Sequence, residues 1–311
     1  DHFCGGVNAA DCMTKIDRMH ISGVYSVLDY SVEGKQNEAQ FNFVVEKTLE
    51  LIAFAAENKA MPFAVFKPTA VGRFELYEKV SKSDILTPAE NKEWERIKTR
   101  FHTICKYAQK MKIAVLVDAE ESWMQDSADT LLFDLMKDYN KESVVVYNTI
   151  QAYRWNRLDY LKELYAIAKK ENFKLGFKLV RGAYMEKERK RAEFKNIKSP
   201  ICKTKADTDI NFDNCLKFIL KHLPDISLFL GTHNENSTLL ALKTLSNLNI
   251  KKNDPRVWFG QLYGMSDHIS FNLAKHEYNA AKYLPFGPVK DVMPYSVSYT
   301  HLTLPTTRCG F

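Results

Sequence analysis

The chain has 311 residues, 45% of them hydrophobic and 12% aromatic, so it can bury a sizeable core and is not intrinsically disordered. Its net charge of +6 is spread along the chain without an arginine-rich arm or zinc-finger spacing, which argues against nucleic-acid binding. No run of about 18 apolar residues occurs, so no transmembrane segment is expected.

Cysteine usage and the first residue bear on the compartment. The chain begins at Asp1 rather than Met, so we expect its natural N-terminus to be missing, and a lost targeting segment stays open. The cysteines show no CxxC spacing and no disulfide-like regularity, which fits a reducing compartment. They are Cys4, Cys12, Cys105, Cys202, Cys215 and Cys309.

Short β-rich runs recur along the whole chain, separated by stretches with apolar residues at helical spacing. The predicted strands are Gly23–Asp29, Pro62–Lys67, Lys112–Asp118, Ser143–Asn148, Lys174–Val180, Ile226–Gly231, Arg256–Leu262 and Ala281–Pro285. The predicted helices are Glu38–Asn58, Glu90–Met111, Asp126–Tyr139, Arg157–Asn172, Asn211–His222 and Glu235–Leu248. A further helix, rich in Glu, Lys and Arg, is expected after Tyr184.

Strand–helix alternation predicts a parallel sheet with helical crossovers, and eight such units close a (βα)₈ barrel. A doubly wound open sheet is the alternative, but no GxGxxG follows the first strand. No composition shift marks a boundary between domains. The long connections Gly72–Thr87 and Phe194–Asp209 are therefore interpreted as elaborations on one barrel.

The stretch Lys174–Met185, KLGFKLVRGAYM, begins as a buried strand and ends in two cations, Lys178 and Arg181. Gly182 and Ala183 then remove side-chain bulk, so that a flat or phosphorylated group could approach the main chain. This pattern is typical of the floor of an anion or cofactor site. A solvated basic strand end followed by a turn is the alternative.

Polar residues follow all of the predicted strands, and in a barrel the carboxyl ends of the strands gather reactive groups. Each of them singly has a structural reading, such as Asp118 capping a helix or Lys67 pairing with it. The histidines are scattered without HExxH spacing, so no metal site is expected, and no GxSxG indicates a nucleophile. The remaining interpretation is a cationic, amide-rich pocket for an anionic cofactor with an extended ring and a small polar substrate.

Six sequence blocks follow one another over roughly Tyr25 to Tyr295: FKPTA, LVDAEESWMQ, KLVRGAYM with EKERKRA, GTHNEN, FGQLYGMSDHISFNLA and KYLPFGPVKDVMPY. Together they resemble the flavin-dependent proline dehydrogenase family, and DYSVEGK at Asp29–Lys35 resembles its monofunctional branch. The resemblance implies a distorted (βα)₈ barrel that binds FAD and oxidises L-proline to Δ¹-pyrroline-5-carboxylate, with electrons passed to a membrane quinone. It also implies a bacterial cytoplasmic protein peripheral to the inner membrane, or alternatively one on the matrix side of the inner mitochondrial membrane.

The resemblance assigns site residues position by position. Lys178 matches the position beneath the flavin, where many members have arginine, and it is expected there as a lone cation at the end of a buried strand. The other cofactor positions are Gln151, Arg181, Gly182, Ala183, Thr232, His233 and Asn234. The substrate pocket is matched by Lys67, Asp118, Tyr184, Leu262, Tyr283 and Tyr295. Lys67, tied to Asp118, would favour the neutral amine of proline that hydride removal requires.

The last stretch departs from the family. After Tyr295 a final helix is expected, but the chain reads SVSYTHLTLPTTRCGF, without apolar periodicity. Ser298 and Tyr299 stand where the family has adjacent arginines that clamp the proline carboxylate. We therefore expect a barrel over 1–295 and an unrelated tail over 296–311. Two alternatives stay open: a flavin-binding but inactive fragment, and a related flavoenzyme acting on another cyclic amine.

Overall fold

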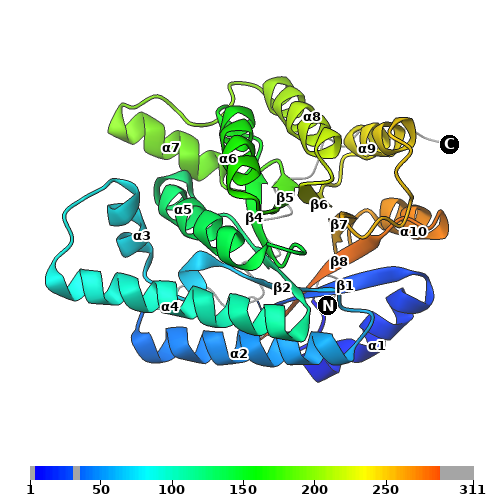
Figure 1. The fold of residues 1–311 in the computed structure, drawn as a ribbon, viewed down its shortest axis with the longest axis horizontal. Coiled ribbons are helices and arrows are strands. Elements are labelled where there is room, and N and C mark those ends of the chain that lie inside the picture. The colour runs from blue at the N-terminus through cyan, green and yellow to red at the C-terminus, as the bar shows by residue number, and fades with distance from the viewer. Residues whose placement is uncertain (1–3, 31–35, 288–311) are drawn as a thin grey trace.

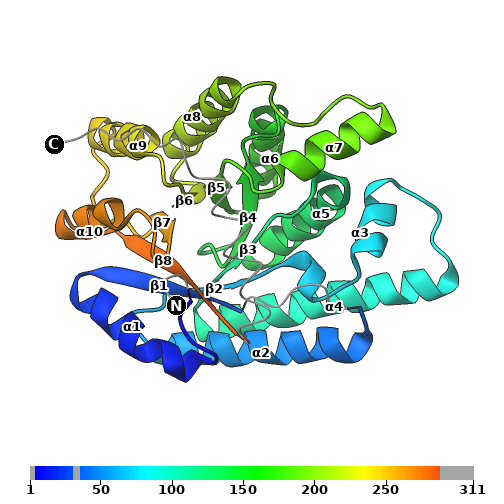
Figure 2. The same cartoon turned by 180° about the vertical axis from the view of Figure 1, so that it is seen from behind.

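The computed structural model describes residues 4–30 and 36–287, within which eight parallel strands form a closed barrel, β1 to β8, surrounded by helices (Figure 1). The strands are β1 (Val24–Tyr30), β2 (Phe63–Phe66), β3 (Ala114–Val117), β4 (Val146–Gln151), β5 (Leu175–Val180), β6 (Ile226–Gly231), β7 (Val257–Leu262) and β8 (Ala280–Phe286). The last strand pairs with the first along its full length and closes the barrel (Figure 2). The predicted (βα)₈ architecture is confirmed, and the open-sheet alternative is wrong.

Five of the described helices, α1, α2, α4, α8 and α9, begin at a residue whose side chain caps the first turn. Thr87 accepts from the Glu90 backbone N–H and Glu90 from that of Thr87, with Pro88 at the first helical position, and Thr204 with Asp207 does the same for α8. The helices are α1 (Ala9–Ile21), α2 (Glu38–Glu57), α3 (Phe74–Ser81), α4 (Pro88–Met111), α5 (Ser122–Tyr139), α6 (Arg157–Glu171), α7 (Met185–Lys195), α8 (Lys205–Lys221), α9 (Glu235–Asn247) and α10 (Asp267–Lys275).

Three features differ from the sequence prediction. α8 begins at Lys205 rather than Asn211, because its first turn is polar and shows only in the cap. β4 lies three residues later than predicted, since its register with β5 runs from Asn148 to Gln151. The polar residues from Asn148 to Gln151 can be buried because they have hydrogen-bond partners. The Thr149 hydroxyl, for example, donates to the carbonyl oxygen of Val117 at 2.7 Å. In addition, α1, α3 and α10 were not predicted.

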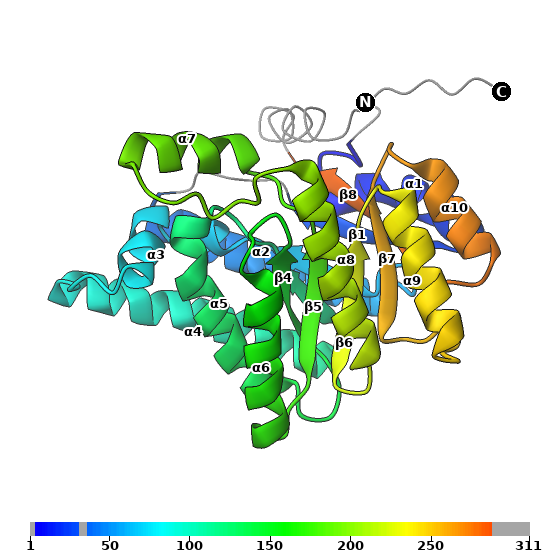
Figure 3. The same ribbon diagram turned by 90° about the horizontal axis from the view of Figure 1, so that it is seen from above.

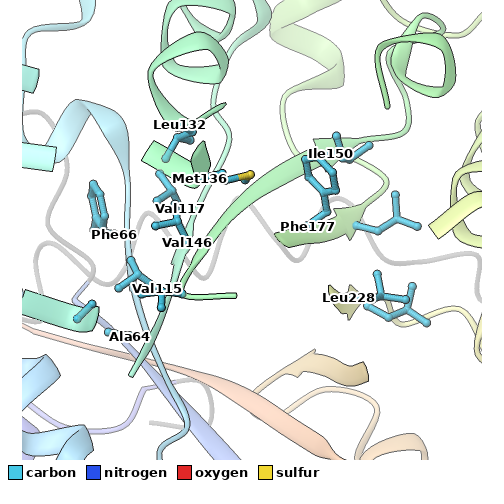
Figure 4. Close-up of a cluster of buried hydrophobic side chains, with 14 of the residues drawn as sticks. Ala64, Phe66, Val115, Val117, Leu132, Met136, Val146, Ile150, Phe177 and Leu228 are labelled. Carbon is cyan, nitrogen blue, oxygen red and sulfur yellow. The ribbon is translucent and has the colours of Figure 1, made fainter. Parts of the chain in front are cut away.

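Side chains alternate between two cores along the strands. Outside the barrel, Ala64 and Phe66 of β2 belong to the apolar layer between the strands and the helices, which also holds Leu132 and Met136 of α5 (Figure 4). Inside it, the ring of Phe63 lies edge-on to Tyr147 and Phe229, with centroids 5.8 and 5.2 Å away. Phe63 begins β2 and Tyr147 lies near the start of β4, so these two rings fill the amino-terminal part of the barrel, whereas Phe229 lies further along its strand, β6.

α7 lies across the end of α5 (Figure 3) and is docked by polar contacts. The buried carboxylate of Glu188 accepts from the Ser122 backbone N–H at 2.6 Å and from its hydroxyl at 2.7 Å, at the N-terminus of α5. α7 follows the Arg181–Tyr184 segment directly, so this docking fixes that segment against the barrel. Over residues 4–30 and 36–287, no helix is both long and apolar enough to cross a membrane.

Candidate active site

A cavity of about 510 Å³ opens at the carboxyl ends of the strands, a size common for small-molecule sites. Strand ends from β3 to β8 contribute to its wall, which is the position expected for a barrel enzyme. Among the residues singled out in the sequence, those that line it are Asp118, Gln151, Lys178, Arg181, Gly182, Ala183, Thr232, His233, Asn234, Leu262 and Tyr283.

Two of the predicted residues lie beside this cavity rather than in its lining. Lys67 precedes the 3₁₀ turn Pro68–Ala70 and acts electrostatically on Glu120. Tyr184 caps α7, with the Lys187 ammonium 5.4 Å from its ring centroid. The third, Tyr295, lies outside the described residues, as do Ser298 and Tyr299.

Lys178 lines the cavity and is not a lone cation, contrary to the sequence prediction. Its ammonium forms an ion pair with Asp118, and both residues are less than 10% exposed. The same ammonium donates to the Tyr283 hydroxyl at 3.2 Å. Asp118, Lys178 and Tyr283 come together because β3, β5 and β8 are parallel strands of one barrel and place these side chains at the same end of it. The result is a rigid cation whose charge is partly balanced by Asp118.

Arg181 is held by side chains from α8, from α9 and from the end of β6. Its Nε donates to Asp209 at 2.7 Å, and its terminal nitrogens donate to the Thr232 and Ser237 hydroxyls at 3.0 and 3.1 Å. Asp209 also pairs with Lys205, which lines the cavity, at 2.6 Å. A fixed guanidinium, a lysine and a hydroxyl on one wall suit a phosphate or another anion.

Two glycines in the cavity wall stand at positions where no side chain would fit. Gly182 has a φ of +133°, and a Cβ there would stand 2.5 Å from the Tyr153 ring. A Cβ on Gly260 would stand 2.1 Å from the Phe229 ring. Both residues line the cavity, so a larger side chain at either place would deform its wall.

Buried amides tie neighbouring strand ends together. The Gln151 amide donates to the backbone oxygen of Glu120 at 2.9 Å, and that of Gln261 donates to the backbone oxygen of Thr232 at 3.0 Å. The Ser270 hydroxyl donates to the Gln261 side-chain oxygen at 2.8 Å. These bonds fix the edge of the cavity in a single geometry.

His233 is a neutral side chain in the cavity wall. Burial, together with the charge of Lys282, lowers its pKa from 6.5 to about 4. Its Nδ1 lies 2.9 Å from the Ser266 hydroxyl, on the turn before α10. At neutral pH it therefore offers one donor and one acceptor, without a charge.

Glu120 lies behind the floor as a buried acid. Burial raises its pKa from 4.5 to about 7, against the opposing effects of Lys67 and of hydrogen bonds from Thr69. The Thr69 backbone N–H donates to its carboxyl group at 2.9 Å and the hydroxyl at 2.6 Å. Because the folded chain holds this proton more tightly than the unfolded chain, ionisation of Glu120 weakens the fold as pH rises from about 4.5 to about 7.

We accordingly expect Glu120→Gln to stabilise the chain at alkaline pH. The glutamine would keep the bond from the Thr69 N–H and donate to its hydroxyl, as a protonated glutamate does. Its advantage in unfolding free energy should be small near pH 4.5 and grow to about 3 kcal/mol above pH 7. Urea unfolding across this range measures the difference, and a pH-independent difference would show that Glu120 ionises normally.

Several lining residues escaped prediction. Phe229 and Thr149 line the cavity but lie inside strands. An apolar or β-branched residue at such a position is expected in the hydrophobic core, so neither was singled out in the sequence. Lys205 reaches the cavity only because the long connection folds back before α8, and the sequence carries no signal for that. Across residues 4–30 and 36–287, no cluster of three or more His, Cys, Asp or Glu side chains could hold a metal ion.

Comparisons with known proteins agree with this geometry. The family model described as "Proline dehydrogenase" matches residues 12–297. Proline dehydrogenase 1, mitochondrial, of Arabidopsis thaliana is 38% identical over 338 residues, covering 95% of this chain and 68% of the relative. The "Carbapenem antibiotics biosynthesis protein CarD" of Pectobacterium carotovorum subsp. carotovorum is 36% identical over 293 residues, covering 94% and 76%.

Solved structures show the same fold. The crystal structure of proline utilization A from Bdellovibrio bacteriovorus, inactivated by N-propargylglycine, superposes with a TM-score of 0.84 at 20% identity. The match covers 96% of this chain and 32% of that one, so the chain corresponds to about a third of that protein. A Dictyostelium discoideum relative, proline dehydrogenase 1, mitochondrial, is 30% identical, and the chain spans 60% of its length.

Proposed function

The chain belongs to the proline dehydrogenase family, and from this premise we propose that it oxidises L-proline to Δ¹-pyrroline-5-carboxylate with FAD as its cofactor. The observation that supports the proposal most is the cavity at the strand ends, where the Lys178–Asp118 pair and Tyr283 meet a wall of fixed cations. We further propose that the electrons pass to a quinone at a membrane surface.

The residues of the cavity fit a flavin dinucleotide. Arg181 and Lys205 supply positive charge for a pyrophosphate, and Thr232 to Asn234 supply polar groups beside the N-terminus of α9. Gly182 and Gly260 line the cavity, and the Tyr153 and Phe229 rings occupy the space that a side chain would need at these two positions. When bound, FAD would supply the two-electron acceptor that the side chains themselves lack.

The chain's own groups would prepare the substrate. We assign to the Lys178 ammonium the stabilisation of the negative charge that would develop on the cofactor during reduction, and Asp118 keeps the ammonium in place. Leu262 and the Tyr283 ring give the cavity an apolar wall that holds a small ring and excludes water. We assign to Lys67 the role of favouring the neutral amine, and to Tyr184 and Tyr295 further substrate contacts.

Two alternative functions can be distinguished from proline oxidation by experiment. The sequence at Ser298 and Tyr299 favours a chain that binds flavin without turning over proline. The similarity to a protein named for carbapenem antibiotics biosynthesis favours a test of other cyclic amino acids, so hydroxyproline and pipecolate belong beside proline.

The test uses the purified chain loaded with flavin. Heat release and chromatography should identify FAD rather than FMN, and proline with a quinone analogue should yield an imine that o-aminobenzaldehyde traps. Bound FAD without product from any of the three amino acids would favour the inactive fragment. Stoichiometric FMN, or no flavin bound, would overturn the proposed cofactor.

A further inference from the structure

Lys282 on β8 is a cation with only 1% exposure, and its side chain does not line the cavity. Its ammonium donates to the backbone oxygens of Met265 and Leu262, at 2.6 and 3.3 Å, and pairs with Asp267 at 2.6 Å. An apolar side chain of similar length would fill this space at a smaller desolvation cost. Unlike an apolar side chain, the ammonium forms hydrogen bonds and an ion pair with the turn between β7 and α10.

That turn carries two parts of the cavity wall. Leu262 lines the cavity directly. Ser266, which has a left-handed φ of +51°, places its hydroxyl 2.9 Å from Nδ1 of His233, and His233 lines the cavity as well. Without internal support, a turn with such a conformation would relax. Lys282 thus connects to the cavity through Leu262 on one side and through Ser266 and His233 on the other.

We propose that Lys282 is a positioning residue for the active site: its ammonium fixes the β7–α10 turn, so that Leu262 and His233 keep their places. Burial is the largest cause of the lowered pKa of His233 and the Lys282 charge adds to it, so that pKa serves as a readout of the position of the ammonium. The side chain does not line the cavity itself. Only the identity of the molecule beside that wall rests on the proposed function.

The charged groups around His233 determine in which direction its pKa should change when one of them is removed. Lys282 faces it from β8 and disfavours imidazolium, whereas Asp267 at the start of α10 partly neutralises Lys282. Glu235 on α9 also lines the cavity, and its carboxylate lies 2.8 Å from Nε2 of His268. Removing the cation should therefore favour protonated His233, and removing the anion should disfavour it.

Two variants of the cofactor-free chain test this by NMR titration of His233. Lys282→Met should raise its pKa from about 4 toward the ordinary value of 6.5. Asp267→Asn, which keeps a hydrogen bond to Lys282, should leave that pKa unchanged or lower it. A rise in both variants would indicate general loosening, and no rise in Lys282→Met would show that Lys282 does not set the state of His233; either result overturns the proposal.

Kinetics of the FAD-loaded chain supply the second readout. Lys282→Met should raise the KM for proline about tenfold and change kcat far less, because a displaced wall weakens ground and transition states alike. Lys282→Arg, which keeps the charge and donors, should recover part of this loss. An unchanged KM overturns the positioning role. If the chain proves unable to oxidise proline, the titration still decides; if Lys282→Met fails to fold, a rise of the His233 pKa in Asp267→Asn alone overturns the proposal.

Discussion

Replacing Lys178 with methionine is expected to slow proline-dependent reduction of the bound flavin by about a hundredfold or more, the size of effect seen when a group that stabilises developing charge is removed. The same change leaves the Asp118 carboxylate buried without its ammonium partner. Breaking a buried pair in this way should lower the free energy of unfolding by about 3–5 kcal/mol.

Two control variants separate chemistry from stability. Lys178→Arg keeps a positive charge at the floor and should retain most of the reduction rate. Asp118→Asn combined with Lys178→Met removes both charges, so it should regain stability while remaining slow. Stopped-flow absorbance measures the rates and urea unfolding the stability. A normal rate in Lys178→Met would show that this cation does not face the reacting atoms.

Replacing Asp129 with alanine is expected to destabilise the chain about as much as Lys178→Met. Its buried carboxylate accepts from Arg157 at 2.9 Å, from Gln125 at 2.8 Å and from Asn148 at 3.0 Å. The loss of these bonds around a buried guanidinium should lower the free energy of unfolding by about 3–5 kcal/mol, a large part of the usual 5–15 kcal/mol.

The effect of Asp129→Ala should also reach the site. The Gln125 side-chain oxygen accepts from the backbone N–H of Glu120, which helps to fix the β3 end that Gln151 contacts. The matched control is Asp134→Ala, an exposed position on the same helix, where a change within about 0.5 kcal/mol is expected. Equal melting temperatures for the two variants would contradict a structural role for this network.

Much of the fold could be predicted because apolar periodicity is a strong signal here. Each of the predicted strands overlaps a strand of the barrel, and their count alone favoured closure. What failed were boundaries set by polar contacts. The first turn of α8 and the buried polar end of β4 carry no apolar pattern, since their burial depends on partners from distant parts of the chain.

The sequence predicted most of the residues that form the site, but not which of them pair with one another. Polar residues after apolar runs marked the strand ends, and most of them share one cavity. The sequence predicted that Lys67 is tied to Asp118 and gave no sign of the ion pair between Lys178 and Asp118, because strand register decides which side chains meet. Lys282 gave no signal, since a lysine inside a strand looks solvated until the strand is buried on both faces.

The most direct test of the central proposal is anaerobic mixing of the FAD-loaded chain with L-proline while the visible flavin absorbance is recorded. The account predicts that proline bleaches the flavin at a saturable rate, and that dithionite bleaches it to the same end point. A flavin that dithionite reduces but saturating L-proline, hydroxyproline and pipecolate leave oxidised would contradict it.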